Sequence, residues 1–548
     1  MKEHEKLTLV LCLTWTATIL YGEMFSFFMP SRFSCSWPHL SSSSASNSSM
    51  NGRGYAVDYV KVAVLADPQI MDKTSLRLPP KSLALEIVQF YTDLYMRRAF
   101  FSSILPLKPD VILFLGDYFD GGPYLSDKEW QESLSRLKHM FGLSTEEIYS
   151  SIKVYHLPGN HDIGYSSLQS HKPEVVGRYE KEFGSRNYRF VVGKVEFIAV
   201  DAQTLDGTLT YASFTANRQG SVASASWGFV SNVSSDHQLY PRVLLTHIPL
   251  YRPDWTDCGP HRSSPIINQR LLHSIPDQEI RYQNYVSEES SNQLLNLIKP
   301  VLVLSGHDHD QCTVAHESKS GSVKEHTLGT ISWQQGNLYP SFMLLSASNS
   351  SLPGASWPEK AVLTHLCFLP MQTHIYIWYL IQFVLTILAL LLWPTSGLSF
   401  CHYFGDLMEC IRKSISLSIF RDGTKEKNED ENCEYEMVWG ADGSMHVVKK
   451  LLAKPVAHSS DRGSVERGNA VMRPTAKKNV NQETEVCLSV ETNANAELDP
   501  KKIPPRASKS KAKIIIQRLV RTFRMLTLIA AVNIPLYMML LFKDWIDK

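Results

Sequence analysis

Apolar residues along this chain occur in two kinds of run. The longer kind has the length that an α-helix needs to cross the hydrocarbon core of a bilayer. Three such runs predict membrane-spanning helices at residues 7–28, 374–393 and 525–542. For the first run a cleaved signal peptide is the alternative, but no obvious small-x-small cleavage site is present. We therefore expect a signal anchor there.

The shorter apolar runs are separated by stretches of helical character, notably residues 82–104 and 130–140. They predict β-strands at residues 60–65, 110–115, 152–156, 195–200, 242–246 and 301–304. Strands that alternate with helices in this way are typical of an α/β domain, whose strand ends gather into one site. We expect this domain to cover residues 58–350.

The remaining segments differ from the domain in composition. Residues 29–57 include a serine-rich stretch and predict a linker, and residues 351–373 predict a juxtamembrane segment. Residues 394–524 are mostly rich in Lys, Glu, Asn and Ser and poor in aromatic residues. Such a composition buries too little apolar surface to offset chain entropy, which predicts a mostly disordered segment.

The distribution of basic residues predicts the orientation of the chain in a membrane. Nine Lys and Arg residues lie within residues 501–524, so segment 394–524 is expected to be cytosolic. Residues 29–373 would then be luminal or extracellular. The N-x-S glycosylation sequons at Asn47, Asn232 and Asn349 all lie on that side. The net charge of +1 gives no indication of a nucleic-acid partner.

Five of the predicted strands end in polar clusters of metal-ligand type. In chain order these are LADPQI with Asp67 and Gln69, LFLGDYFD with Asp117 and Asp120, LPGNHDI with Asn160, His161 and Asp162, LLTHIPL with His247, and LSGHDHD with His307 and His309. Each is weak alone, because a single histidine is more often a hydrogen-bonded core residue. Five in order, often beside a glycine that lets the backbone approach an ion, indicate a metal site.

The order of these motifs resembles that of the calcineurin-like metallophosphoesterases, namely D-x-H, G-D-x-x-D, G-N-H-[D/E], H and G-H-x-H. The resemblance implies an α/β fold, a four-layer α/β/β/α sandwich with flanking transmembrane helices, and two divalent metals. It also assigns roles. Asp67, Gln69 and His309 would hold one metal, and Asn160, His247 and His307 the other. Asp117 would bridge both, His161 would be the catalytic histidine held by Asp162, and Asp120 would lie behind the ligands.

The residue types in these motifs suit phosphoester chemistry. Two dications close together repel each other, so a bridging carboxylate is needed to hold them. Only Asp67 and Asp117 are clearly anionic ligands, which leaves the site net positive and attractive to a phosphate ester. His161 could then donate a proton to the departing alkoxide. Mn²⁺ is the expected metal, with Fe²⁺, Mg²⁺ and Zn²⁺ as alternatives.

Gln69 is the one departure from the general pattern, which has histidine at this position. An amide oxygen is neutral, as imidazole is, but it is harder and suits Mn²⁺ or Mg²⁺ better than Zn²⁺. Gln69 is therefore expected to be a weaker ligand of the first metal. The alternative is that Gln69 hydrogen-bonds Asp67 or a bound water without touching the metal.

Cys258 and Cys312 each follow one of the polar strand ends by a short loop. A disulfide between them is expected on the luminal side, where oxidation is permitted. Two unpaired buried cysteines are the alternative. The chain has no C-x-x-C pair that would suggest a zinc site.

The stretches MRRAF, HIPLYR and SW…YPSF resemble the GPI-anchor-remodelling branch of the family. The resemblance implies removal of ethanolamine phosphate from the GPI glycan, with GPI-anchored proteins or the glycolipid as partners and membrane lipid around the spans. It places the protein in the ER or Golgi. The alternatives are a luminal nucleotidase or other phosphomonoesterase, and a non-catalytic cargo-sorting or manganese-homeostasis protein.

Overall fold

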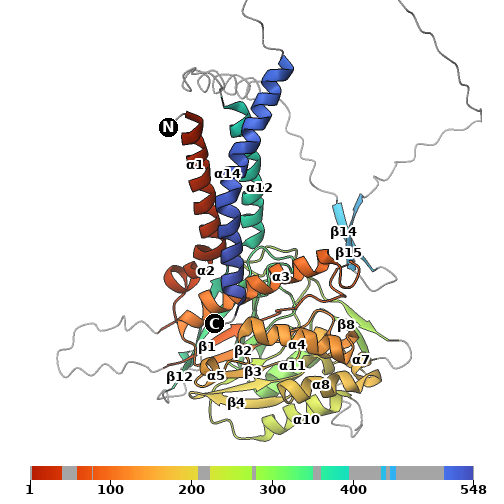
Figure 1. Cartoon of the computed structure of the whole chain (residues 1–548). Coiled ribbons are helices and arrows are strands. Elements are labelled where there is room, and N and C mark those ends of the chain that lie inside the picture. Colours follow the sequence, from red (N-terminus) through yellow and green to blue (C-terminus); the bar gives the residue numbers. More distant parts are fainter. Residues whose placement is uncertain are drawn as a thin grey trace, which may run out of the picture. The chain divides into compact units, whose positions relative to one another are not determined.

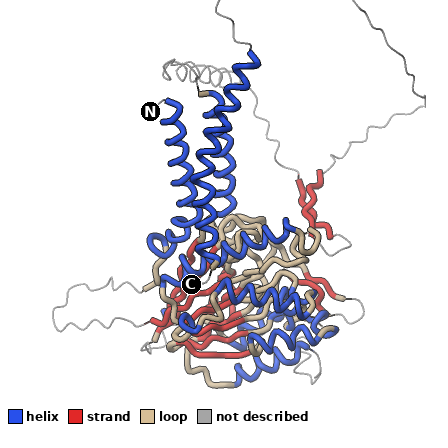
Figure 2. Tube along the Cα trace, viewed as in Figure 1, coloured by secondary structure: helices blue, strands red, loops and turns tan. Residues whose placement is uncertain are grey.

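A computed structural model describes residues 3–39, 59–76, 78–207, 222–274, 279–349, 360–393, 433–439, 445–451 and 511–546. The chain forms two compact units. The first comprises residues 1–393 and 516–548, and the second comprises residues 394–515. Figure 2 shows that the strands of the first unit are gathered in one α/β domain, whereas its longest helices lie outside the sheets.

Two β-sheets form the centre of the α/β domain. The first has the order β13–β12–β1–β2–β3, and the second has the order β10–β11–β9–β6–β5–β4. The strands of the first sheet are β1 (Tyr59–Leu65), β2 (Val111–Phe114), β3 (Lys153–His156), β12 (Ser341–Ser348) and β13 (Val362–Phe368). Those of the second are β4 (Tyr188–Val192), β5 (Val195–Ala199), β6 (Arg242–Leu245), β9 (Leu302–Ser305), β10 (Cys312–Ser318) and β11 (Gly321–Thr327). A small separate sheet pairs β7 (Leu271–His273) with β8 (Ile280–Gln283).

Alternate residues of each central strand enter different cores, because side chains on a strand point to opposite faces. In β1, Val62 and Val64 join a cluster with β5, β6 and β9 of the other sheet, whereas Ala63 and Leu65 join a cluster with α3 and α4. A third cluster packs β5, β6 and β9 against α10 and α11. Each central sheet therefore has one face toward the other sheet and one face toward helices.

Sequence signals mark both ends of α4. In α4 (Asp127–Phe141), Ser126 and Glu129 form a capping box, and Gly142 ends the helix with a φ of 61°. The other α-helices are α1 (Glu3–Leu20), α2 (Ser26–Met29), α3 (Leu83–Arg98), α5 (Glu146–Tyr149), α6 (Asn160–Ile163), α7 (Ser166–His171), α8 (Pro173–Phe183), α10 (Val222–Ser235), α11 (Glu288–Ile298), α12 (Gln372–Leu392) and α14 (Lys511–Trp545). Three π-helical segments, η1 (Tyr21–Phe25), η2 (Pro30–Ser34) and η3 (Ala99–Ile104), continue the helices before them. Short 3₁₀ turns are η4 (Leu105–Leu107), η5 (Gly122–Tyr124) and η6 (Ala202–Thr204).

The mixed α/β fold expected from the sequence is confirmed, and each of the six expected strands is present. The domain extends past its expected end at residue 350, however, because β13 pairs with β12 along its whole length. Part of the expected linker also packs on the domain. A disulfide joins Cys35 to Cys367, and the indole of Trp37 donates a hydrogen bond to the carbonyl of Leu107 at 2.8 Å.

Three helices are long and apolar enough to cross a membrane, namely residues 4–34, 372–392 and 515–545. They run side by side (Figure 1). Polar side chains connect them: Trp15 donates to Thr386 at 2.9 Å, and Thr16 lies 2.9 Å from Asn533. Such hydrogen bonds are a common means of holding apolar helices together in lipid.

A buried ion network attaches these helices to the α/β domain. Arg98, in α3, pairs with Glu23 from the first long helix and with Asp544 at the end of α14. Its guanidinium also donates to the carbonyl of Leu540 at 3.0 Å, and Tyr379 of α12 donates to Glu23 at 3.0 Å. Glu23 is only 1% exposed, so the one charge within the first apolar run is neutralised by a residue of the domain.

The second unit contains one described element. Strands β14 (Cys433–Trp439) and β15 (Met445–Leu451) pair antiparallel along seven residues each. This hairpin lies within the segment expected to be disordered, where the sequences CEYEMVW and MHVVKKL each carry several apolar residues. The rest of residues 394–510 lies outside the described residues, as do most of residues 29–57.

Replacing Arg98 should test the ion network. Arg98→Ala leaves the buried Glu23 carboxylate without its cationic partner, which typically costs about 3–5 kcal/mol. We expect a markedly lower melting temperature of the purified full-length chain in detergent. The matched control is Arg189→Ala, since Arg189 is 44% exposed and pairs with Glu196 and Asp236 near the surface, where ion pairs contribute about 0–1 kcal/mol. Equal melting temperatures for both variants would contradict the proposed role of Arg98.

Candidate dinuclear metal centre

The parallel strands bring the candidate ligands to one edge of the two sheets. In the first sheet β1, β2 and β3 are parallel, and Asp67, Asp117 and Asn160 follow their carboxyl ends. In the second sheet β6 and β9 are parallel, and they are followed by His247 and by the segment of His307 and His309. Residues far apart in the sequence therefore meet where the carboxyl ends of both sheets adjoin.

The backbone of these loops has an unusual conformation. Nine non-glycine residues have a positive φ within the described part of the chain, and five of them are candidate ligands: Asp67, Gln69, Asp117, His307 and His309. Non-glycine residues rarely adopt this region, and clusters of them are typical of functional sites. The fold therefore stabilises a strained backbone where these side chains converge.

Hydrogen bonds hold the first two ligand loops together. The N–H of Gln69 donates to the carbonyl of Asp117 at 2.8 Å, and that of Ile70 donates to Tyr118 at 2.8 Å. This short ladder continues the pairing of β1 and β2 beyond the strands. The backbone N–H of His307 donates to the Asp67 carboxylate at 3.0 Å, which ties the second sheet to the first.

The donor atoms form two groups that share one residue. Asp117, His247 and His307 form the first group, and Asp67, Asp117 and His309 form the second, with all donor atoms of a group within 4.8 Å of one another. Each group combines residues from both sheets. A cation in either group would therefore link the two sheets, and Asp117 is placed to touch both cations.

Two buried carboxylates dominate the electrostatics of the site, because Asp67 and Asp117 have no exposed surface. Burial and repulsion from Asp117 raise the pKa of the Asp67 carboxyl. Burial also opposes ionisation of Asp117, but the imidazoles of His247 and His161 outweigh it and hold its pKa below the usual range. Burial likewise opposes protonation of His247, yet the Asp117 and Asp67 carboxylates raise its pKa to about 9.

The other two histidines favour the neutral form that a metal requires. Burial and the charge on His247 lower the pKa of His307 to about 3, and burial lowers that of His309 to about 4. His247 Nδ1 lies 2.8 Å from the carbonyl of Leu115, and His307 Nε2 lies 3.2 Å from that of Gln283. These contacts leave one nitrogen of each ring available as a ligand.

The two candidate amide ligands lie among these groups. Gln69 is 1% exposed, and the end of its side chain lies 3.0 Å from Asp117 Oδ2 and 2.9 Å from His309 Nε2. The Asn160 amide oxygen lies 3.1 Å from His247 Nε2. Each amide is thus adjacent to the donor group to which the sequence pattern assigned it. Both contacts of Gln69 are made by its amide nitrogen Nε2, so they are hydrogen bonds to candidate ligands and leave both the ligand role and the alternative open.

His161 lies at the open side of the site, but its partner is not the expected one. Its side chain is 37% exposed, and its Nδ1 contacts the carbonyl of Asp120, with the Asp120 carboxylate at 3.8 Å. Burial opposes protonation of His161, but Asp117 and Asp120 raise its pKa above the usual value. The protonated ring suits a proton donor.

The Asp162 carboxylate does not hold His161, contrary to the expectation from the sequence. It accepts hydrogen bonds from the backbone N–H groups of Gly159, Asp117 and Tyr118 at 2.8 Å each, and of Phe119 at 3.2 Å. Asp162 occupies the first turn of α6, from which its side chain faces back toward these amides. It therefore fixes the loop that carries Asp117, and Asp120 takes the place beside the imidazole.

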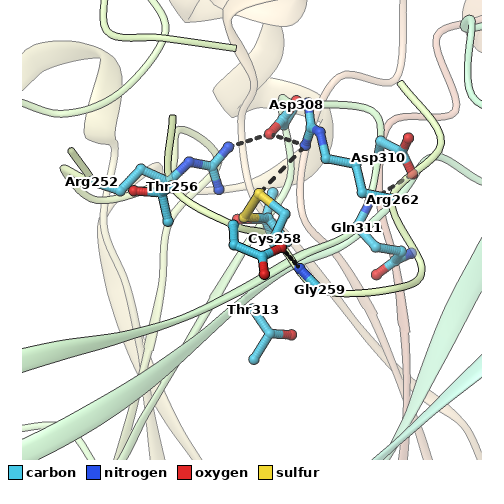
Figure 3. The surroundings of a disulfide bond; sticks show 12 residues. Arg252, Thr256, Cys258, Gly259, Arg262, Asp308, Asp310, Gln311 and Thr313 are labelled. Atoms are coloured by element: carbon cyan, nitrogen blue, oxygen red, sulfur yellow. Dashed lines mark hydrogen bonds and ion pairs between the residues drawn. A yellow bond between two sulfur atoms is a disulfide. The ribbon is translucent and has the colours of Figure 1, made fainter. Parts of the chain in front are cut away.

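The sequence motifs gave no indication of a cluster of charged residues beside the two donor groups. Asp308, between His307 and His309, pairs with Arg252 and Arg262, and the Arg262 contacts measure 2.8 Å (Figure 3). Next to this pair the structure joins Cys258 to Cys312. The carbonyls of Leu115 and Gln283 also contact site histidines, and backbone groups carry no residue-type signal that could have revealed them.

The donor set fits divalent cations. It combines carboxylate, amide and imidazole donors without a cysteine, which suits Mn²⁺, Fe²⁺, Mg²⁺ or Zn²⁺. Burial and the charge on Asp117 disfavour ionisation of Asp67, and a cation beside this carboxylate would offset both effects. The residues present therefore fit a pair of metals.

Comparisons with known proteins agree with this geometry. The family model described as calcineurin-like phosphoesterase matches residues 60–311. Cell division control protein 1 of Saccharomyces cerevisiae is 30% identical over 345 residues, which cover 59% of this chain and 64% of the yeast protein. Metallophosphoesterase 1 of Rattus norvegicus is 29% identical over 380 residues, which cover 67% of this chain and 88% of the rat protein. Metallophosphoesterase 1 of Danio rerio is 31% identical over 299 residues, which cover 52% of this chain and 70% of the Danio rerio protein.

The fold and the site thus define a metal-dependent phosphoester hydrolase. The chain belongs to the calcineurin-like phosphoesterase family. Among the relatives reported above, the yeast protein is matched over less than two thirds of its own length.

Gly159→Ala should disrupt the metal centre although Gly159 is not itself a candidate ligand. A Cβ at Gly159 would lie 1.9 Å from Asp117 Oδ1 and 2.4 Å from the Asp117 nitrogen, so the shared carboxylate would have to move. We expect the purified variant to retain fewer than two metals per chain by elemental analysis. Gly177→Ala, in α8, is the control, since its Cβ would meet nothing within 4 Å. A Gly159→Ala protein with full metal content would contradict the shared position of Asp117.

Manganese affinity should rise with pH up to about pH 9. The pKa of His247 is about 9 and that of Asp67 is raised to about 8, so at lower pH a metal must displace their protons, whereas His307 and His309 are already neutral. For each displaced proton the affinity should rise by about tenfold per pH unit. Calorimetry at pH 6.5, 7.5 and 8.5, in buffers of different ionisation enthalpy, measures both affinity and released protons. An affinity that is constant across this range would contradict the assignment.

Proposed function

We propose that the protein is a membrane-anchored dinuclear-metal phosphodiesterase that removes ethanolamine phosphate from the glycan of GPI anchors, in the ER or Golgi, and so supports maturation and export of GPI-anchored proteins. The proposed metals are two Mn²⁺ ions. The proposed domain is a four-layer α/β/β/α sandwich flanked by transmembrane helices. Its ligands are Asp67, Gln69 and His309 for one metal and Asn160, His247 and His307 for the other, with Asp117 shared.

The observation that carries this proposal is the position of Asp117 in both donor groups. A carboxylate shared by two donor groups could hold a pair of neighbouring cations, and such pairs are characteristic of phosphoester hydrolases. When bound, the cations would supply Lewis-acid stabilisation of the phosphoryl oxygens and an activated water. The chain itself supplies the remaining roles.

His161 would donate the proton that the leaving group needs. The reaction adds water to phosphorus and breaks the P–O bond to the sugar, which yields the sugar hydroxyl and ethanolamine phosphate. The contact of Nδ1 with Asp120 orients the ring and leaves Nε2 for the sugar oxygen. Burial opposes protonation of the ring, but Asp117 and Asp120 raise its pKa and so favour the protonated form that this step consumes.

Several features support a luminal position for the α/β domain. The two disulfides, Cys35–Cys367 and Cys258–Cys312, lie on the side of the spans expected to be luminal, where oxidation is permitted. The sequon residues Asn232 and Asn349 are exposed, as a glycan requires, and Asn47 lies outside the described residues. A membrane tether also suits a substrate that is itself held in the membrane.

The proposal is tested by hydrolysis of a mannoside that carries ethanolamine phosphate. With Mn²⁺, the purified full-length chain should release ethanolamine phosphate. Asp117→Ala should abolish turnover, since losing the shared ligand removes several kcal/mol of transition-state stabilisation. His161→Ala should keep both metals and slow turnover by about 10²–10⁴-fold. The matched control is His237→Ala, because His237 is exposed on the loop before β6.

Each alternative predicts a different result in this assay. Faster hydrolysis of nucleotides or simple monoesters than of the mannoside would indicate a nucleotidase or other phosphomonoesterase. Metal binding without hydrolysis of any phosphoester would indicate a cargo-sorting or manganese-homeostasis protein. Near-native turnover of Asp117→Ala would mean that the two-metal assignment is wrong.

Substitutions of Gln69 should alter the manganese requirement. Gln69→His should bind the first metal more tightly and tolerate Zn²⁺ better, because imidazole is the softer donor. Gln69→Ala should raise the Mn²⁺ concentration for half-maximal rate, with a smaller effect at saturation because water can take the vacant position. Gln335→Ala, a half-buried glutamine outside both donor groups, is the control. Superimposed titrations for the wild type and both Gln69 variants would show that Gln69 is not a ligand.

A further inference from the structure

A cavity of about 670 Å³ lies where the long helices meet the α/β domain. One wall comes from the first long helix and includes Tyr21, Met29 and Ser34, and another comes from the start of α12, including Trp378. The domain closes the cavity with Pro260, His261, Tyr339 and Phe368. We call this space the interface cavity. Its size lies within the range of small-molecule sites, and most of its lining is apolar or aromatic.

The interface cavity is placed to receive a chain from the membrane. Tyr21 is 57% exposed and Trp378 is 51% exposed, and each lies on a helix able to span a bilayer. Aromatic residues at such positions are typical of the membrane–water boundary. Phe33 precedes the lining residue Ser34 and is 79% exposed, and Leu338 precedes the lining residue Tyr339 and is 43% exposed, so exposed apolar side chains adjoin lining residues of both the helix and the domain.

One loop of the domain joins the cavity to the metal centre. Residues 258–264, here called the clasp loop, line the cavity with Pro260 and His261. The next residue, Arg262, pairs with Asp308 at 2.8 Å, and Asp308 lies between His307 and His309. The Cys258–Cys312 disulfide fixes the same loop (Figure 3). The Ser263 N–H, which donates to the Asp310 carboxylate at 2.8 Å, fixes it as well.

A second segment makes the same connection. Gln334 donates to the backbone carbonyl of Gln69 at 3.3 Å, while its neighbour Trp333 packs edge-on against Tyr376 of α12, with ring centroids 5.6 Å apart. Tyr339, at the end of this segment, lines the cavity. The ligand loops of the metal centre are therefore a few residue contacts from the first turns of α12.

We infer that the interface cavity holds the hydrocarbon tail of the membrane-anchored phosphoester that the metal centre would hydrolyse. This inference rests on the proposed function and adds a recognition element to it. The tail enters between the first long helix and α12, and the polar part of the substrate extends along the clasp loop toward the metals. Selection for an anchored substrate then comes from the cavity, and the chemistry comes from the metal centre.

Photochemical labelling of the wild-type chain tests where the tail lies. The probe is a mannoside with ethanolamine phosphate on a diacylglycerol anchor that carries a diazirine in one acyl chain, added to full-length protein in phosphatidylcholine nanodiscs. We expect labels in residues 258–264 and 372–379, displaced by excess unlabelled anchored mannoside. Labels spread over exposed residues such as Leu380, Leu385 and Leu392 would overturn the inference. Equal labelling of the cavity by a diazirine phosphatidylcholine would overturn it too, since a bilayer lipid would then be the occupant.

Kinetics of a matched pair of substrates provide the second test. Ser34 is exposed and lines the cavity, so Ser34→Trp should fill it, whereas Phe33→Trp places the same side chain one residue away, outside the lining. We expect Ser34→Trp to raise KM for the anchored mannoside by about tenfold, with kcat/KM for the soluble methyl mannoside unchanged. Phe33→Trp should alter neither. Equal effects of the two variants on the anchored substrate would contradict the inference.

The two tests separate this inference from the proposed function. If wild-type protein hydrolyses neither mannoside, the proposed function is wrong, and labelling still reports whether the cavity takes the tail. If it hydrolyses both mannosides with equal kcat/KM, the function stands and the cavity plays no part in selection. If Ser34→Trp loses activity toward the soluble mannoside as well, the variant is misfolded and the labelling pattern alone decides.

Discussion

The carboxylates of Asp67 and Asp117 lie together in the protein interior, where neither has any exposed surface. Buried like charges repel strongly, and much of the surrounding structure offsets that repulsion. The imidazole of His247 and the backbone N–H of His307 approach from the opposite sheet. Because the compensating groups come from both sheets, cations in the two donor groups would stabilise the packing of the sheets as well as bind substrate.

The same requirement explains the strained loops. A strand end that continued in extended conformation would carry its side chain away from the facing sheet, and five candidate ligands instead have a positive φ. Asp162 offsets part of this cost by accepting hydrogen bonds from four backbone amides, those of Asp117, Tyr118, Phe119 and Gly159. Its burial and its nearness to Asp117 raise its pKa to about 7. A residue that resembles a catalytic partner in sequence thus acts as a support for the ligand loop.

Local patterns in the sequence were enough to predict the central strands and the convergence of five polar strand ends, because parallel strands place their carboxyl ends at one edge. The same patterns could not show that Asp120, and not Asp162, contacts His161, because both acids belong to metal-type motifs. The difference arises from the turn of α6, which directs the Asp162 side chain toward backbone amides. The strand β13 was not predicted, because residues 351–373 were expected to be a juxtamembrane segment. Its pairing with β12 depends on a partner strand on the other side of residues 350–359 in the sequence. The Glu23 charge was visible in the first apolar run, but its partner Arg98 is 75 residues away in sequence.

The ion network around Arg98 links the order of synthesis to the final topology. Arg97 and Arg98 emerge from the ribosome long before α14, whose last turns supply Asp544 to both arginines. Until that helix arrives, Arg98 lacks the Asp544 carboxylate and the Leu540 carbonyl, and it is paired with Glu23. In the proposed topology, the carboxyl end of α14 and the α/β domain lie on the same side of the membrane, which is the arrangement that lets Asp544 reach Arg98. An inverted last helix would lose this contact, so the network would favour one orientation of α14.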